Sequence, residues 1–233
     1  MEGYGEAVFA TEYLCKEYRH TVALRDVSIT IPRGQIYGLI GENGAGKTTQ
    51  IEALHRFLLD HGIEVVRTRE PGGTPLGEKI RAMLLNDEMD VTAETLLFFA
   101  SRAQHIRDVI LPALERGAWV LSDRFTDATY AYQVGAKGYD AEYVLQLEAI
   151  VQKGFQPNKT VLFDLDPQTA ARRLALSRTA DRFETQDCDF FTRVRKAYLA
   201  RAAASPERFF VLDAGQTPEA ITAQLLDEAK GWL

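Results

Sequence analysis

Residues 41–49 form a glycine-rich run that ends in a lysine and two threonines, Gly-Glu-Asn-Gly-Ala-Gly-Lys-Thr-Thr. The run fits the pattern G-x-x-x-x-G-K-[ST], and it lies between an apolar run at 36–40 and apolar residues at helical spacing. In such a strand–turn–helix context, backbone N–H groups can approach a phosphate, and the helix directs its positive end toward it. We expect Lys47 to contact the β- and γ-phosphates of a nucleotide and the Thr48 hydroxyl to bind Mg²⁺. A chance glycine-rich turn is the alternative, and the flanking strand and helix disfavour it.

Charged residues follow two of the other predicted strands at their carboxyl ends. Arg69 follows the strand at 64–68, and Asp123 and Arg124 follow the strand at 118–122. An aspartate beside a phosphate loop can hold Mg²⁺ directly or through water, and an adjacent arginine can bind phosphate oxygens. The alternative for Asp123 and Arg124 is a surface ion pair. We favour the functional interpretation because ligands of parallel α/β sheets bind at these strand ends.

Two further features have plain structural alternatives. Phe98 and Arg102 share one face of a predicted helix and together could hold a planar base, although each taken alone suits a core or a solvated position. Several arginines lie between 172 and 182, in a polar loop between two helices. Such a loop could close over phosphates, or it could be a solvated charged turn.

The elements that must position these residues alternate along the chain. Strands are predicted at 64–68, 118–122, 160–164 and 209–213. Helices are predicted at 48–61, 76–84, 91–117 with a break at Pro112, 127–133, 141–153, 167–176, 190–203 and 218–232. This alternation predicts an α/β P-loop NTPase fold, with a parallel sheet and helices on both of its faces.

Residues 7–34 differ from the rest of the chain. Two β-branched and apolar stretches, 7–14 and 22–31, flank a short polar connection and predict an antiparallel β-strand pair that leads into the core. No Gly/Ser-rich or Pro-rich linker follows them. We therefore divide the chain into a β segment, 1–34, that packs on the core, and a P-loop domain, 35–233.

Composition narrows the class of partner. The chain has 233 residues, of which 46% are apolar and 26% charged, as is usual for globular proteins with a large core. A net charge of -6 gives no electrostatic case for a nucleic-acid polymer or an anionic membrane. Cys15 and Cys188 lack metal-binding spacing, and no apolar run has transmembrane length. We expect a soluble cytoplasmic protein with no membrane partner.

From about residue 50 to the end, the chain resembles bacterial thymidylate kinases. The matching runs are Thr-Arg-Glu-Pro-Gly-Gly-Thr at 68–74, Phe-Phe-Ala-Ser-Arg at 98–102, Asp-Arg-Phe at 123–125, Ala-Tyr-Gln at 131–133 and Asp-Arg-Phe-Glu at 181–184. The resemblance implies a nucleoside monophosphate kinase fold. It also implies transfer of the γ-phosphate of ATP, bound with Mg²⁺, to dTMP, which gives dTDP on the way to dTTP. Homodimers formed through helices are a further expectation from the family.

The resemblance also implies roles for individual residues. Arg69 and Arg124 would hold the dTMP phosphate, Phe98 would stack on thymine, and the dTMP contacts as a set would be Arg69, Phe98, Arg102, Arg124, Thr129 and Gln133. The catalytic residues would be Lys47, Arg124 and Arg178, the last in a lid at about 174–186. The P-loop pattern and the strand end, rather than the resemblance, predict that Mg²⁺ is bound by Thr48 and Asp123. The P-loop pattern also predicts the ATP contacts Gly41, Asn43, Gly44, Ala45, Gly46, Lys47, Thr48 and Thr49.

Residues 8–49 resemble the opening of an ABC-transporter ATPase, a family in which an aromatic residue, here Tyr18, stacks on adenine. The L-S-G-G-Q signature and the downstream strand that ends in Asp-Glu are missing, so a complete ABC ATPase that drives a membrane partner ranks last. Our hypothesis is a recombined or engineered chimera of two P-loop proteins.

The junction between the two parts of such a chimera would lie in the P-loop. Asn43 occupies a position where the kinase family has a carboxylate that contacts the deoxyribose 3′-hydroxyl. We therefore expect either an impaired thymidylate kinase or a chimera that binds ATP without useful phosphoryl transfer.

Overall fold

A computed structural model describes residues 7–18, 21–32, 34–175 and 187–233, with side chains for 34–173 and 187–233. Its core is a five-stranded sheet in the order β4-β5-β3-β6-β7, and every neighbouring pair is parallel. The strand that leads into the P-loop therefore lies at the centre of the sheet. The strands are β3 (Ile36–Gly41), β4 (Val65–Arg69), β5 (Trp119–Asp123), β6 (Lys159–Asp164) and β7 (Phe209–Asp213).

Helices follow the strands in the predicted alternation and differ from the predicted ranges by a few residues at their ends. They are α1 (Lys47–Asp60), α2 (Pro75–Asn86), α3 (Val91–His105), α4 (Leu111–Glu115), α5 (Thr126–Thr129), α6 (Ala141–Gln152), α7 (Pro167–Ala175), α8 (Cys188–Ala204) and α9 (Pro218–Lys230). Two segments are π-helical, η1 (Ile106–Ile110) and η2 (Tyr130–Ala136).

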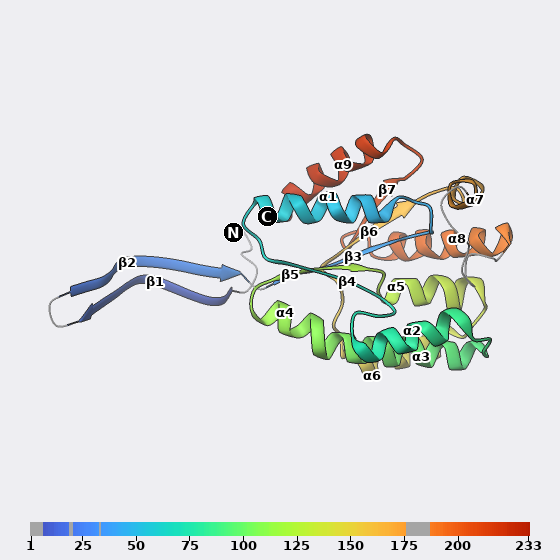
Figure 1. The fold of residues 1–233 in the computed structure, drawn as a ribbon, viewed down its shortest axis with the longest axis horizontal. Helices are drawn as coiled ribbons and strands as arrows, with labels where there is room; N and C mark the ends of the chain where they lie inside the picture. Colours follow the sequence, from blue (N-terminus) through green and yellow to red (C-terminus); the bar gives the residue numbers. More distant parts are fainter. Residues whose placement is uncertain (1–6, 19–20, 33, 176–186) are drawn as a thin grey trace.

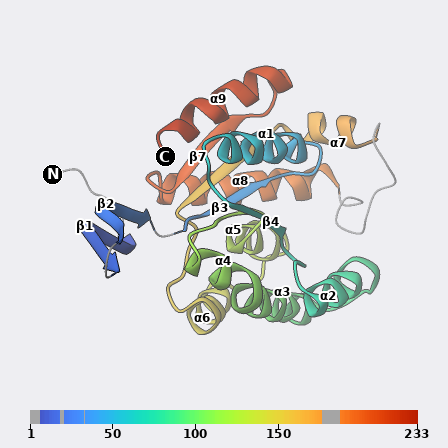
Figure 2. The same cartoon turned by 60° about the vertical axis from the view of Figure 1, so that its left-hand side comes forward.

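Helices cover both faces of the sheet, as the sequence predicts (Figures 1 and 2). Alternate residues of β3 point to opposite faces. Tyr37 and Leu39 pack with apolar residues of α1 and α9, whereas Ile40 packs with η2 and α8, and Ile36 with η1 and α4. Because apolar layers cover both sides, β3 is buried along its whole length.

The long helix predicted over 91–117 is interrupted earlier than the sequence indicates. Pro112 has no backbone N–H and cannot donate to the carbonyl four residues before it, which breaks the α-helical ladder. The chain responds with the π-helical turn η1, which begins at Ile106, and α4 then continues to Glu115. The three segments remain continuous along one side of the sheet (Figure 1).

The N-terminal stretches form the expected antiparallel pair, β1 (Ala7–Tyr18) and β2 (Thr21–Pro32). The pair is a two-stranded sheet of its own, separate from the five-stranded sheet. Figure 1 shows the hairpin extending away from the body, which differs from the expected packing on the core. The chain passes from Pro32 into the amino end of β3, opposite the end that carries the P-loop.

No helix among the described residues has both the length and the apolar character needed to cross a membrane.

Candidate functional site

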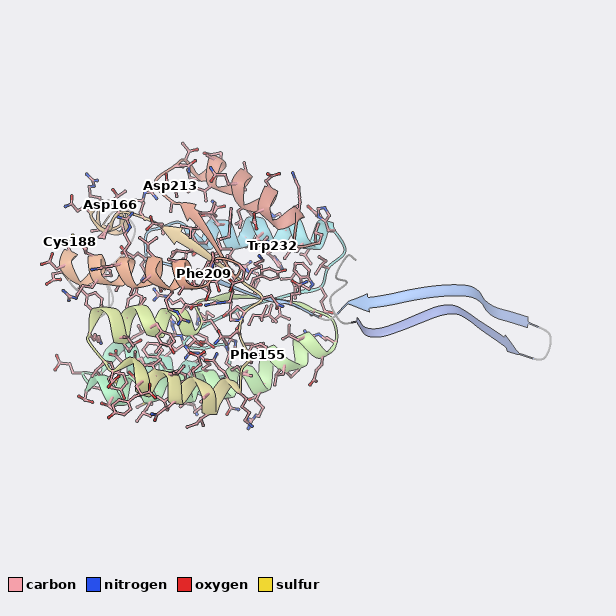
Figure 3. All side chains as sticks on the ribbon, turned by 180° about the vertical axis from the view of Figure 1, so that it is seen from behind. Phe155, Asp166, Cys188, Phe209, Asp213 and Trp232 are labelled. Atoms are coloured by element: carbon pink, nitrogen blue, oxygen red, sulfur yellow. The ribbon has the colours of Figure 1, made fainter. Side chains whose placement is uncertain are left out.

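The carboxyl ends of the central strands bring the chemical residues together. Arg69 at the end of β4 is in register with Asp123 at the end of β5, and Asp123 is in register with Leu39 of β3, just before the P-loop. Figure 3 shows Asp166, two residues after β6, and Asp213, the last residue of β7, at the end of the body far from the hairpin. The site therefore lies at the edge of the sheet where ligands of such folds bind.

The P-loop curls over the end of β3 in a conformation that requires glycine. Gly41 has φ 140, and a Cβ there would lie 2.6 Å from the carbonyl oxygen of Phe163. Gly46 has φ 80 and is the N-cap of α1, which begins at Lys47. The Lys47 Nζ donates to the carbonyl oxygens of Gly41 and Glu42, both at 2.9 Å, which closes the loop. The N–H groups at the start of α1 then face the site, as phosphate binding requires.

One cavity of about 430 Å³ connects the P-loop to the residues predicted for the second substrate. Its size is that of a site for a small ligand. It is lined by Asn43, Gly44, Gly46, Lys47, Thr48 and Thr49 on the loop side, and by Arg69, Phe98, Arg102, Asp123, Arg124, Thr129 and Gln133 beyond it. Gly41 and Ala45 lie behind the lining, where they shape the loop.

At one end of the cavity, α3 presents a buried arginine. Arg102 is 1% exposed; its Nε donates to Glu70 Oε2 at 2.8 Å, and its Nη2 donates to Thr129 Oγ1 at 3.1 Å. Glu70 also accepts a hydrogen bond from His105 Nδ1 at 3.0 Å. The Arg102 Nη1 is buried and has no hydrogen-bond partner among the described residues. This end therefore offers a fixed donor to a ligand that carries an acceptor.

Phe98 lies one helical turn before Arg102 on α3 and is partly buried, so it lines the cavity as well as packing in the protein. Opposite it, η2 positions Gln133, whose Nε2 donates to Glu94 Oε1 at 2.9 Å. Asp90 caps α3, since its side chain accepts from Thr92 N at 2.7 Å and fixes the helix that carries these residues.

At the other end, three arginines gather beside the P-loop. The Arg124 Nη2 donates to Asn43 Oδ1 at 2.8 Å, and the Arg69 Nη2 donates to Glu78 Oε2 at 2.8 Å. The Arg81 Nη1 donates to the carbonyl oxygen of Pro71 at 3.0 Å. Burial, followed by the charges of Arg69 and Arg124, lowers the pKa of the Arg81 guanidinium. Cations that repel one another in this way form a site for a polyanion.

Arg81 is a cavity residue that the sequence analysis missed, and so are Glu70 and Tyr132. Arg81 lies on α2, whose capping residue Thr74 accepts from Gly77 N at 2.9 Å. In the sequence it is one of several charged residues on an amphipathic helix. No spacing signal separates it from its exposed neighbour Lys79.

The two predicted metal ligands lie on this cavity. Thr48 is exposed in the first turn of α1, and Asp123 ends β5. The Asp123 Oδ1 is buried and has no hydrogen-bond partner among the described residues, which suits an oxygen that binds a cation. The residues present therefore fit Mg²⁺.

Several predicted features lie outside what the structure describes. Arg178 belongs to residues 176–186, which are not described, and so does most of the predicted lid at 174–186. The backbone of Tyr18 is described, paired with Thr21 at the end of β1, but its side chain is not. The roles proposed for Arg178 and Tyr18 therefore remain predictions.

Comparisons with known proteins agree on one family. The family model for thymidylate kinase matches residues 40–225. A thymidylate kinase of Methylobacillus flagellatus is 51% identical over 195 residues, which cover 84% of this chain and 96% of that protein. One from Thiobacillus denitrificans is 52% identical over 192 residues, 82% of this chain and 94% of that protein. The crystal structure of thymidylate kinase from Ehrlichia chaffeensis superposes with a TM-score of 0.69 at 30% identity and covers 85% of this chain and 99% of that one.

Proposed function

Because the chain belongs to the thymidylate kinase family and is a nucleoside monophosphate kinase, we propose that it transfers the γ-phosphoryl group of ATP to dTMP. The observation that carries the proposal is that both predicted sets of contacts share one cavity. All six residues predicted to contact dTMP line it together with Lys47 and Thr48 of the P-loop. A nucleotide held by the loop and a monophosphate held by the arginines would therefore meet in the same cavity.

The chemistry of the lining suits transfer between two phosphates. The acceptor oxygen of a monophosphate is already ionised, so no strong general base is needed, and rate depends on positioning and charge neutralisation. Lys47 and the loop N–H groups would hold the ATP phosphates, while Arg69, Arg81 and Arg124 would hold the dTMP phosphate. A dTMP oxygen bonds to the γ-phosphorus, the bond from that phosphorus to the bridging oxygen breaks, and ADP leaves.

Mg²⁺ would be held by Thr48 and Asp123, as their positions on the cavity allow. When bound, it would neutralise charge on the ATP phosphates. Arg178 would contribute a further cation from the lid, although it lies outside the described residues.

The adenine position is proposed to be the one usual for nucleoside monophosphate kinases, between the lid and the loop after Asp213. Arg173 of α7 lines the cavity on that side and donates to the carbonyl oxygen of Ala214 at 2.9 Å, which ties the two segments together. Tyr18, by contrast, ends β1 at the tip of the hairpin, beyond the amino end of the sheet (Figure 1). Its backbone position disfavours stacking on a base at the P-loop.

A coupled assay of ADP formation with ATP, Mg²⁺ and dTMP tests the proposal. We expect ADP release that depends on dTMP. ATP binding without such release would favour a binding module instead, and release that needs no dTMP would favour an ABC-type ATPase.

The chimera and its impairment remain hypotheses. The comparisons give no support to an ABC-ATPase-like segment, and residues 1–39 lie outside the family model. Asn43 lacks the charge that the family resemblance implies at its position, but it has a defined role in the structure, because its Oδ1 accepts from Arg124 Nη2 at 2.8 Å. The turnover number in the same assay would show whether the Asn43 amide supports phosphoryl transfer in place of a carboxylate.

We also propose that the chain forms a homodimer through α3 and α6, which pack side by side. Both helices expose apolar side chains to solvent, among them Leu96 at 49%, Tyr143 at 54% and Ile150 at 69%. A neighbouring apolar set of this kind is typical of an interface. Sedimentation equilibrium of the intact chain tests it, and a monomer at micromolar concentration would contradict it.

A further inference from the structure

We call the end of the cavity lined by Phe98 and Arg102 the base end, and the end lined by Arg69, Arg81 and Arg124 the phosphate end. Two rows of side chains face each other at the base end. On α3, Glu94, Phe98 and Arg102 are spaced four residues apart and so share one face of the helix. Thr129 at the end of α5, Gln133 in η2 and Lys137, the C-cap of η2, have the same spacing. The rows run in opposite directions, because Arg102 donates to Thr129 at one end and Glu94 accepts from Gln133 and Lys137 at the other.

Glu94 is a buried acid with a defined set of donors. Its side chain is 0% exposed, and the Lys137 Nζ lies 2.6 Å from both Oε1 and Oε2. The paired carboxylate can only accept hydrogen bonds. The group of Gln133 that lies 2.9 Å from Oε1 must therefore be the amide NH₂, which leaves its carbonyl oxygen as the group available to the cavity.

We propose that Glu94, held by Lys137, is a positioning residue that fixes the Gln133 amide in one orientation and so selects the base. The inference rests on the proposed function. Arg102 Nη1 is a donor without a partner among the described residues, and Gln133 supplies an acceptor. Thymine presents the matching edge, with an acceptor at O4 and a donor at N3–H, whereas cytosine presents a donor at N4 and an acceptor at N3.

If cytosine bound in place of thymine, its donor would face Arg102 and its acceptor would face the Gln133 carbonyl oxygen. Buried groups of the protein and of the base would then be unpaired, and a mismatch of this kind discriminates strongly between two bases. Glu94 touches no substrate in this scheme. It acts only through Gln133, so its loss should change selectivity more than turnover.

The test compares Glu94→Gln with the wild type, using dTMP and dCMP as acceptors. A glutamine at 94 offers both a donor and an acceptor, so the Gln133 amide can adopt either of its two flipped orientations. We expect the ratio of kcat/KM for dTMP to that for dCMP to fall by about tenfold or more, while kcat for dTMP falls by less than about threefold. Calorimetric binding of each monophosphate without ATP provides a readout that does not depend on phosphoryl transfer.

Matched variants separate positioning from folding. Lys137→Arg keeps the cation and should keep the ratio, whereas Lys137→Met should lower it. Asp127→Asn changes another buried acid, which is paired with Arg201 and Arg208 and does not line the cavity, and it should lower stability without changing the ratio.

An unchanged ratio in a folded Glu94→Gln protein overturns the inference. If that variant does not fold, Lys137→Met decides in the same way. If the wild type shows no dTMP-dependent ADP formation, the proposed function fails. The binding ratio of the two monophosphates then still decides whether Glu94 orients Gln133.

Discussion

The two ends of the cavity are stabilised in opposite ways. At the base end, buried acids hold their partners in fixed geometry: Glu70 bonds to Arg102 and His105, and Glu94 bonds to Gln133 and Lys137. At the phosphate end, Arg81 and its neighbouring arginines repel one another, and Arg81 is held by a carbonyl oxygen rather than by an acid. At the base end the charges are paired without ligand, and the Arg102 Nη1 is left as a donor without a partner among the described residues. At the phosphate end Arg69 pairs with Glu78, whereas Arg81 and Arg124 donate to neutral oxygens, so a bound anion would supply their counter-charge.

Mutations at the two ends should therefore differ in how much they lower folding stability and how much they lower activity. A charge removed from the base end leaves a buried partner unpaired, which lowers folding stability. A charge removed from the phosphate end relieves repulsion in the free protein, so it lowers activity and hardly affects stability.

The largest effect is expected at Arg124. Its Nη2 bonds to Asn43 Oδ1 at 2.8 Å, and its guanidinium stacks over the ring of Tyr132 at 4.9 Å, which aims it at the cavity. Arg124→Gln should lower kcat/KM by about 10³-fold in the coupled assay, because a cation that neutralises phosphate charge is lost. The free energy of unfolding in urea should fall by less than about 1 kcal/mol. A matching loss of stability would contradict the comparison.

The base end should show the reverse at Glu70. Glu70→Gln leaves Arg102, which is 1% exposed, without its charged partner, and should lower the free energy of unfolding by about 3 kcal/mol. Urea denaturation measures it. The double variant Glu70→Leu with Arg102→Met removes both charges and should be more stable than the single variant. If Glu70→Gln is as stable as the wild type, the ion pair between Glu70 and Arg102 does not stabilise the base end.

Arg81 tests the phosphate end without touching the P-loop. Arg81→Ala should raise the KM for dTMP by about tenfold, because one of three cations that face the monophosphate is lost, and should leave stability nearly unchanged. Lys79→Ala is the matched control: it removes the same charge from the same helix, but Lys79 is exposed and does not line the cavity. Equal changes in KM for both variants would mean that only the overall charge matters.

The elements could be predicted from local patterns in the sequence, and so could the position of the P-loop and of the residues at the strand ends, whereas Thr129 and Gln133 were expected only from the family resemblance. Apolar periodicity gave the order of strands and helices, and the ends of parallel strands must meet at one edge of the sheet, which brought Arg69 and Asp123 together. Glu94 and Arg81 could not be recognised, since a charged residue on a helix is usually solvated. The burial of Glu94 and the position of Arg81 on the cavity depend on how α2, α3 and η2 pack, and no local pattern encodes that packing.

The pH dependence of stability should report on Glu42, a buried acid of the P-loop that has no salt bridge among the described residues. It is 4% exposed, and its Oε1 has no hydrogen-bond partner among the described residues. Burial raises the pKa of Glu42 to about 7, against the lowering influence of Arg195 and Lys47. The folded protein therefore holds a proton between pH 4.5 and about 7 that the unfolded chain has lost, so this carboxyl makes stability fall as pH rises through that window.

Glu42→Gln cannot ionise, so its free energy of unfolding should exceed that of the wild type by about 2 kcal/mol at pH 8 and should nearly match it at pH 5. Asp127 makes folding stability change with pH in the opposite direction. Burial alone would raise its pKa, but Arg208 and Arg201 lower it, so its carboxylate stabilises the fold above about pH 4 and the contribution is lost as pH falls further. Asp127→Asn should thus be less stable than the wild type at pH 7, with the gap closing in acid. If Glu42→Gln were instead the less stable protein at pH 8, the Glu42 carboxylate would be held by its neighbours as firmly as the acids of the base end, and the contrast between the two ends would rest on the arginines alone.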